Sequence, residues 1–196
     1  MTAPLYGLLL SGGASRRMAR DKAALEYRGE AQLLRAWRLL SGICAQSFVS
    51  IRPEQAEDGL RNSLPTLPDR YEAVGPIAGI LSAQDAYPDA AWLVLACDLP
   101  LLDEKTLHDL VAARAPGIDA IAFRSRFDDL PEPLCAIWEP SSHPFLKERH
   151  DAGRFCPRAT LKHLRTRLLP PPGNALDNIN TPDDFERVSQ ILERTA

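Results

Sequence analysis

The chain has 196 residues, of which 45% are hydrophobic and 25% are charged, and its formal net charge is −3. These proportions predict one folded domain with a sizeable core and exclude disorder as the main state. The small negative charge argues against a nucleic-acid-binding surface, and no apolar stretch approaches the ~20 residues that a membrane-spanning helix needs.

The amino-terminal residues 1–10 have neither the cationic start nor the cleavage site of a signal peptide, so we expect a cytoplasmic protein. The chain contains no Cys-x-x-Cys motif, which argues against a zinc site or a dithiol redox motif. Because a chain of this length folds without cross-links, we expect reduced and mostly buried thiols. The cysteines are Cys44, Cys97, Cys135 and Cys156.

Apolar runs alternate with helical patterns from end to end. In chain order, the expected elements are a strand at 6–11, a helix at 31–43, a strand at 48–51, a helix at 77–86, a strand at 92–97, a helix after Asp103, strands at 118–123 and 134–138, and a helix after Thr181. Asp103 and Thr181 are expected caps of the helices that follow them. The proline-rich residues 170–173 are expected to lead into a last strand and the final helix.

Alternating strands and helices of this kind predict a single α/β domain with a mostly parallel central sheet flanked by helices. We expect residues 1–196 to form this one domain. Ligands of open α/β sheets gather beyond the carboxyl ends of the strands. Two such ends carry unusual chemistry here, one after Ser11 and one after Cys97.

The first of these ends leads into a glycine-bearing, strongly cationic segment, residues 10–22, with the sequence LSGGASRRMARDK. Gly12 and Gly13 permit a close approach of a ligand to the main chain, and Arg17 and Lys22 are among the cations that follow. Backbone amides combined with Arg and Lys side chains suit a polyphosphate. Neither the dinucleotide fingerprint nor the common phosphate-loop pattern is present, so the segment belongs to another class of phosphate site.

This segment resembles the signature of nucleotidyltransferases that load a nucleoside triphosphate onto a small phosphorylated acceptor. The resemblance is strongest to the molybdenum cofactor guanylyltransferases, the MobA family, and it covers the whole chain. Four further blocks come in the order and at about the spacing of that family. They are Gly75–Gly79, Cys97–Pro100, Pro131–Leu134 and Asn178–Pro182.

The resemblance implies a single-domain, three-layer, Rossmann-like fold of the GT-A nucleotidyltransferase type. Within it, we expect residues 1 to about 100 to form the nucleotide-binding part and residues from about 101 to 196 the acceptor-binding part. It also implies transfer of GMP from GTP to the terminal phosphate of molybdopterin, which releases pyrophosphate. We expect a monomer that has GTP and molybdopterin as substrates and that binds neither nucleic acid nor membranes. Contacts with other proteins of molybdenum cofactor biosynthesis, or with the enzymes that accept the product, would be transient.

Three charged residues are the expected catalytic groups. Lys22 is expected to neutralise phosphate oxygens and the departing pyrophosphate, with Arg17 reinforcing it. Asp98 ends the most apolar strand, where a carboxylate either caps the next segment or binds Mg²⁺; we favour Mg²⁺ because two anionic reactants must meet there. Because a phosphate monoester is already ionised near neutral pH, the reaction needs no general base.

Some of the remaining site residues correspond to positions of the family, and the others are chosen for their charge or small size. Asp69 corresponds to a position that contacts guanosine, although a plain turn aspartate is the alternative. The expected nucleotide-binding residues are Leu10, Ser11, Gly12, Gly13, Lys22, Asp69, Gly75, Gly79 and Asp98. Asn178 and Asn180 correspond to residues on the pterin side, although Asn180 could instead shape the turn before the final helix. Arg154 or Arg158 is expected to receive the acceptor's phosphate.

Three rival functions remain open from the sequence. A cytidylyltransferase, acting on molybdopterin or on another small phosphate or sugar acid, shares most of these features. A non-catalytic nucleotide-binding relative is the second rival, because the family usually has glycine where this chain has Ala19. An oxidoreductase of the Rossmann type is the third, and the missing dinucleotide fingerprint disfavours it.

Overall fold

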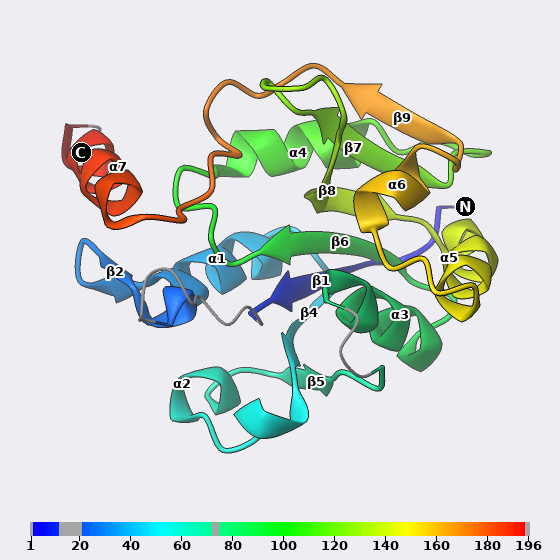
Figure 1. Cartoon of the computed structure of the whole chain (residues 1–196), viewed down its shortest axis with the longest axis horizontal. Helices are drawn as coiled ribbons and strands as arrows, with labels where there is room; N and C mark the ends of the chain where they lie inside the picture. The colour runs from blue at the N-terminus through cyan, green and yellow to red at the C-terminus, as the bar shows by residue number, and fades with distance from the viewer. Residues whose placement is uncertain (1, 12–20, 72–74, 195–196) are drawn as a thin grey trace.

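The computed structural model describes residues 2–11, 21–71 and 75–194 (Figure 1). The described residues form a seven-stranded sheet in the order β5-β4-β1-β6-β8-β7-β9, in which β8 is antiparallel to both of its neighbours and the other pairs are parallel. Its strands are β1 (Leu5–Leu10), β4 (Gln46–Ile51), β5 (Thr66–Pro68), β6 (Ala91–Ala96), β7 (Ala120–Arg124), β8 (Pro131–Trp138) and β9 (Thr166–Leu169). A separate two-stranded hairpin is formed by β2 (Glu26–Tyr27) and β3 (Glu30–Ala31). The sequence prediction of a mostly parallel sheet is confirmed.

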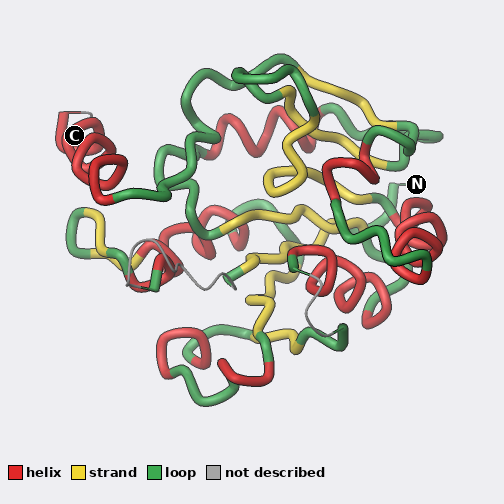
Figure 2. The backbone as a smooth tube through the Cα atoms, viewed as in Figure 1, coloured by secondary structure: helices red, strands yellow, loops and turns green. Residues whose placement is uncertain are grey.

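Helices cover both faces of this sheet, which gives the three layers of the expected fold (Figures 1 and 2). The helices are α1 (Gln32–Ser41), α2 (Gly59–Asn62), α3 (Pro76–Ala86), α4 (Glu104–Ala112), α5 (His143–Asp151), α6 (Pro157–Leu161) and α7 (Pro182–Arg194). Buried side chains of α1 and α4 pack in one apolar cluster, and those of α3, α5 and α6 pack in another on the opposite face. Short 3₁₀ helices lie at Lys22–Ala24, Pro53–Gln55 and Pro140–Ser142.

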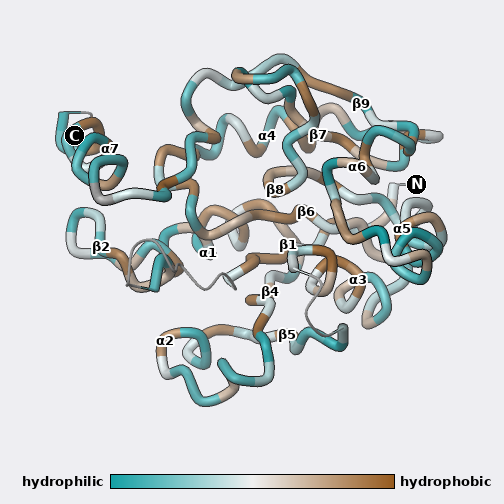
Figure 3. Tube along the Cα trace, in the orientation of Figure 1, coloured by the Kyte–Doolittle hydropathy of each residue, from teal (hydrophilic) through white to brown (hydrophobic). Residues whose placement is uncertain are grey.

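The central strand β6 shows why the sheet is buried on both faces. All of its residues are buried, and those from Ala91 to Leu95 alternate between the two clusters. Leu93 and Leu95 face α1 and α4, whereas Trp92 and Val94 face α3. A continuous apolar run of this kind is typical of a parallel strand between two helical layers, and it forms the hydrophobic centre of Figure 3.

N-terminal caps mark the start of two helices where the sequence predicts them. Asp103 accepts a hydrogen bond from Thr106 N at 2.8 Å and caps α4. At α7, Thr181 Oγ1 accepts from Asp184 N at 3.2 Å, and Asp184 Oδ2 accepts from Thr181 N at 3.1 Å in return. This reciprocal pair is a capping box with aspartate in place of glutamate.

The prediction of a last strand after the proline-rich residues 170–173 is wrong. The strand at this edge, β9, lies before the prolines, and the segment from there to α7 contains no strand. Proline lacks the N–H that a strand ladder requires, so pairing stops at the first proline. The short elements β2, β3, β5, α2 and α6 were also not predicted, because each is too short to show a periodic pattern.

All four cysteines are free thiols, and only Cys156 is exposed. Burial, together with the neighbouring Asp98 charge, raises the pKa of the Cys97 thiol to about 12. Cys97 is therefore a protonated core residue at neutral pH, as the sequence analysis interpreted the cysteines. None of the helices in the described ranges is long and apolar enough to cross a membrane.

Candidate active site

The carboxyl ends of three neighbouring parallel strands lie level with one another. Leu10, the last residue of β1, pairs with Ser50 of β4 on one side and with Ala96 of β6 on the other. Ser11 follows the end of β1 directly, and Asp98 lies two residues beyond the end of β6. The topology therefore brings the two chemically unusual strand ends to the sheet edge where α/β proteins bind ligands.

Lys22 connects this edge with a segment near the end of the chain. Its ammonium donates hydrogen bonds to Asp98 Oδ2 at 2.9 Å and to Asn180 Oδ1 at 2.8 Å. The side chains of Lys22 and Asp98 are 16% and 21% exposed, so the ion pair is shielded but still reaches solvent. Ile179 N donates to the Asp98 carbonyl at 3.2 Å, which holds the segment before α7 against the end of β6. The structure thus brings the predicted phosphate, metal and acceptor residues into direct contact.

The local backbone directs Lys22 toward Asp98. Asp21 is extended and caps the 3₁₀ helix Lys22–Ala24, because its Oδ1 accepts a hydrogen bond from Ala23 N at 3.0 Å. Ala23 is completely buried in the cluster that includes α1. A cap on one side and a buried methyl group on the other determine where the Lys22 side chain leaves the main chain.

Asp98 is the residue predicted to bind Mg²⁺. Within the described ranges, no three His, Cys, Asp or Glu side chains gather closely enough to hold a metal ion. Asp98 Oδ2 accepts from Lys22, and Oδ1 has no hydrogen-bond partner among the described residues. Mg²⁺ is usually held by one or two carboxylates together with substrate phosphates and water. A single shielded carboxylate fits an Mg²⁺ ion that binds with a triphosphate.

Asp69 lies beside the end of β4, in the next part of the same edge. Its Oδ1 accepts a hydrogen bond from Ser50 Oγ at 2.6 Å, and its N–H donates to the Ile51 carbonyl at 2.8 Å. Burial raises the pKa of Asp69 above its usual value, although the Ser50 hydrogen bond and the charge of Arg52 lower it in part. The carboxylate is therefore held in a poorly solvated position, where a further hydrogen-bond donor would stabilise its charge.

The glycines Gly75 and Gly79 allow α3 to start close to this carboxylate. Gly75 caps the helix with φ of 67°, a left-handed conformation that favours glycine. At Gly79, an added Cβ would lie 2.6 Å from Ser50 Oγ and 2.8 Å from Leu10 Cδ2. Only glycine therefore lets α3 pack against the ends of β1 and β4 at this distance.

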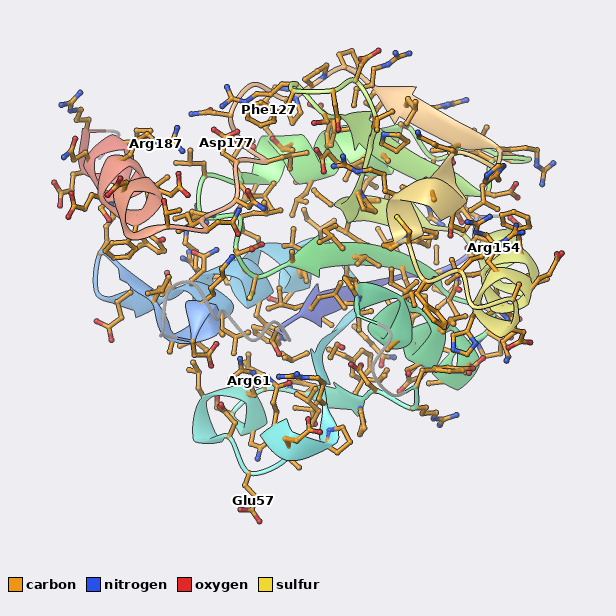
Figure 4. All side chains as sticks on the ribbon, in the orientation of Figure 1. Glu57, Arg61, Phe127, Arg154, Asp177 and Arg187 are labelled. Carbon is orange, nitrogen blue, oxygen red and sulfur yellow. The ribbon has the colours of Figure 1, made fainter. Side chains whose placement is uncertain are left out.

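The structure separates the residues predicted for the acceptor. Asn180 is in the cluster described above, and the neighbouring Asn178 is exposed. Arg154 is exposed beside α5, at the end of the molecule opposite α7, where β1 and β6 begin (Figure 4). Arg158 donates to Asp128 at 2.8 Å and to Glu132 at 2.9 Å. The structure therefore does not bring Arg154 to the site: packing of α5 against α3 places it elsewhere.

Part of the predicted site lies outside the described residues. Gly12, Gly13 and Arg17, together with Ala19, belong to residues 12–20. Conversely, Arg61 and the hydrogen bond from Ser50 to Asp69 were not predicted from the sequence. Arg61 is 2% exposed and donates to residues of three different segments. An arginine in the short polar stretch around α2 gives no sequence signal, because only the fold brings its partners together.

Comparison with known proteins finds relatives along nearly the whole chain. Residues 7–167 match the family model described as the MobA-like NTP transferase domain. A "Molybdenum cofactor biosynthesis bifunctional protein" from Synechocystis sp. is 37% identical over 95% of this chain, and the chain spans 54% of the length of that protein. A "Probable molybdenum cofactor guanylyltransferase" from Opitutus terrae is 32% identical over 93% of this chain and 94% of its own length.

A solved structure shows the same arrangement of elements. Molybdopterin-guanine dinucleotide biosynthesis protein A from Archaeoglobus fulgidus superposes with a TM-score of 0.81 and covers 96% of this chain and 99% of its own. The sequences are 24% identical, and at that level the likeness establishes the fold alone.

Proposed function

The chain belongs to the MobA-like NTP transferase family, and on this basis we propose that it transfers GMP from GTP to the terminal phosphate of molybdopterin. The products are molybdopterin guanine dinucleotide and pyrophosphate. The observation that carries the proposal is the contact of Lys22 with both Asp98 and Asn180. These contacts support the proposal because they join a cation suited to phosphate, a carboxylate suited to Mg²⁺ and the amide proposed for the acceptor side.

The residues of this cluster suit nucleotidyl transfer, in which positioning and charge stabilisation do most of the catalysis. Lys22 binds triphosphate oxygens and neutralises the charge that develops on pyrophosphate, and Arg17 is proposed to assist it. Asp98 is proposed to hold Mg²⁺, which when bound supplies further neutralisation between the two anionic substrates. The molybdopterin phosphate is itself the nucleophile, so the chain needs neither a nucleophilic side chain nor a general base.

Recognition of the base is proposed for the cluster around Asp69. Its carboxylate is oriented by Ser50 and held where burial raises its pKa, so it gains most from donors on a bound base or ribose. Gly75 and Gly79 keep α3 close without filling the space beside Asp69 with a side chain. A site built from such polar contacts discriminates strongly between bases.

The decisive experiment measures pyrophosphate release by purified protein with Mg²⁺, molybdopterin and each of the four nucleoside triphosphates in turn. We expect release with GTP that requires both Mg²⁺ and molybdopterin. Release with CTP and not with GTP would show a cytidylyltransferase instead. Tight GTP binding without release from any nucleotide would show the non-catalytic relative.

A further inference from the structure

Arg61 is a buried arginine whose side chain is almost completely enclosed. It lies in α2, near the end of β1 in Figure 4, and its residue is 2% exposed. All five guanidinium N–H groups have acceptors. Nε donates to Ser11 Oγ at 3.0 Å, and the terminal nitrogens donate to the Ser11 carbonyl, Asp21 and Asp58.

Two of these partners lie at the two ends of residues 12–20, within the cationic segment 10–22. Ser11 directly precedes residues 12–20, and Asp21 directly follows them and precedes Lys22. The fork of Arg61 contacts both oxygens of Asp21, at 2.8 Å to Oδ2 and 3.1 Å to Oδ1. A bidentate arginine–carboxylate pair is the most directional ion pair available to a protein. One side chain therefore determines how far apart these two ends lie.

The same contacts continue to the second part of the site. Ser11 Oγ donates to the Ser50 carbonyl at 2.9 Å, and Ser50 Oγ donates to Asp69. On one side, Arg61 is linked through Ser11 and Ser50 to Asp69, the proposed base-binding carboxylate. On the other side, it is linked through Asp21 to the backbone that carries Lys22. The hydrogen bonds form one continuous series between the two parts of the sheet edge.

Arg61 also changes the electrostatics next to Lys22. Asp21 is a carboxylate beside the proposed triphosphate site, where an unpaired negative charge would repel the phosphates. Burial alone would lower the pKa of Arg61, but the hydrogen bonds and charges of Asp21 and Asp58 outweigh burial and raise it. The guanidinium therefore keeps its positive charge, and it lies directly against the Asp21 carboxylate.

We propose that Arg61 is a positioning residue of the nucleotide site, which holds Ser11 and Asp21 so that Lys22 meets Asp98 and the triphosphate. This inference rests on the proposed function in that it assigns the triphosphate to Lys22. It makes Arg61 an element of substrate binding that acts through Asp21, without touching the substrate itself.

Two carboxylates provide a matched pair of variants, because each pairs with Arg61 and each caps a short helix. Asp21→Asn weakens the link to the cationic segment, whereas Asp58→Asn weakens only the link of Arg61 to its own helix. Asparagine retains the capping oxygen in both. We expect a similar loss of thermal stability in the two variants, which is all that a purely structural role of Arg61 predicts.

The distinguishing readout is the affinity of folded protein for inorganic tripolyphosphate and for MgGTP, measured by calorimetry. We expect Asp21→Asn to weaken both affinities about 10-fold or more, because small displacements of a binding group are costly. Asp58→Asn should stay within about twofold of wild type. Removing a negative charge without any positioning effect would instead tighten anion binding. Tighter or unchanged binding by Asp21→Asn therefore overturns the proposal. An equal loss of affinity in Asp58→Asn also overturns it.

Arg61→Lys provides a second test, because lysine keeps the charge but cannot form the fork. Adding Asp21→Asn to Arg61→Lys should weaken tripolyphosphate binding little beyond Arg61→Lys alone, since Arg61→Lys already breaks the link to Asp21. Fully additive losses would contradict the proposal. If wild-type protein binds triphosphate but releases no pyrophosphate from GTP and molybdopterin, the proposed transfer fails while these variants still decide the role of Arg61. If wild-type protein binds no triphosphate, both proposals fail.

Discussion

At the scale of single residues, Lys22 has the most direct chemical consequence. An ammonium group has three donors, and described residues use two of them, at Asp98 and Asn180. Both acceptors are themselves proposed ligands of the substrates or of Mg²⁺. The free protein therefore holds its phosphate-binding cation in place with the groups among which the substrates would bind.

We expect Lys22→Ala to lower kcat/KM for pyrophosphate release about 10²- to 10³-fold, because it removes a positioned charge from the developing pyrophosphate. Initial rates at several GTP concentrations measure the effect. Lys162→Ala is the control, since Lys162 is an exposed lysine after α6 and should leave kcat/KM unchanged. A loss below about threefold for Lys22→Ala would remove this residue from the catalytic group.

Asp69 offers a prediction in which activity and stability change in opposite directions. Burial raises its pKa in the folded protein above the ordinary value of 3.8. Between these two pKa values the folded state binds more protons than the unfolded state, so this group makes wild-type stability fall as the pH rises through that window. Asp69→Asn abolishes the dependence and retains an oxygen for Ser50.

We therefore expect Asp69→Asn to melt at a higher temperature than wild type at pH 7, with the difference shrinking toward pH 4, while KM for GTP rises about 10-fold. Thermal melts across this pH range and steady-state kinetics measure both effects. Asp119→Asn is a control of opposite sign, because Arg165 lowers the pKa of Asp119 to about 2. That variant should be less stable than wild type at pH 7. A lower melting temperature for Asp69→Asn at pH 7 would contradict the argument.

At the scale of elements, the position of α3 decides the shape of the nucleotide side of the site. The helix packs against β1, β5 and β6, and Gly79 is the residue that faces the strand ends. Its close neighbours are Ser50, Leu10 and, at 3.3 Å from an added Cβ, Asp69. A shift of α3 would therefore move the same side chains that are proposed to bind the nucleotide.

We expect Gly79→Ala to destabilise the fold by about 1–2 kcal/mol, since overpacking at 2.6 Å outweighs the helix propensity that alanine adds. The melting temperature should fall by about 2–8 °C, and KM for GTP should rise. Gly42→Ala is the matched control, because an added Cβ there would have its nearest contact at 3.5 Å. Equal melting temperatures for the two variants would show that α3 yields without cost.

At the scale of the whole molecule, one sheet joins the two halves of the chain. The strands β5, β4, β1 and β6, from residues 5–96, form one half of the sheet. The strands β8, β7 and β9, from residues 120–169, form the other half. The segment before α7 returns across this sheet to Asp98 and Lys22. Mg²⁺ is proposed to bind at Asp98 together with the substrate triphosphate, so we expect it to stabilise the nucleotide complex and not the free protein.

We accordingly expect EDTA to leave the melting temperature of the free protein within about 1 °C of its value in buffer. MgGTP at about 100 times its Kd should raise the free energy of unfolding by about 2.7 kcal/mol. Differential scanning calorimetry with and without each addition measures both effects. EDTA added to the MgGTP complex should cancel most of the gain. A large destabilisation of free protein by EDTA would instead indicate a metal bound by the chain alone.

The sequence predicted more of the fold than of the site. The long elements are visible because hydrophobic periodicity is a local property, as in α1 and β6, and the caps at Asp103 and Thr181 depend only on near neighbours. Lys22, Asp98, Asp69 and Asn180 were singled out by motif, since each block is contiguous. Arg154 was chosen by charge alone, and the packing of α5 places it at the other end of the molecule.

The amino-acid sequence by itself determined the α/β class, the order of the main elements and the residue types of a phosphate site, because these depend on side chains close together in the chain. Only the tertiary structure decided which of those residues meet. The contact of Lys22 with Asn180 and the role of Arg61 between Ser11 and Asp21 depend on sheet order and helix packing. Contacts between distant residues follow from how all the elements bury their apolar faces together, which no local pattern records.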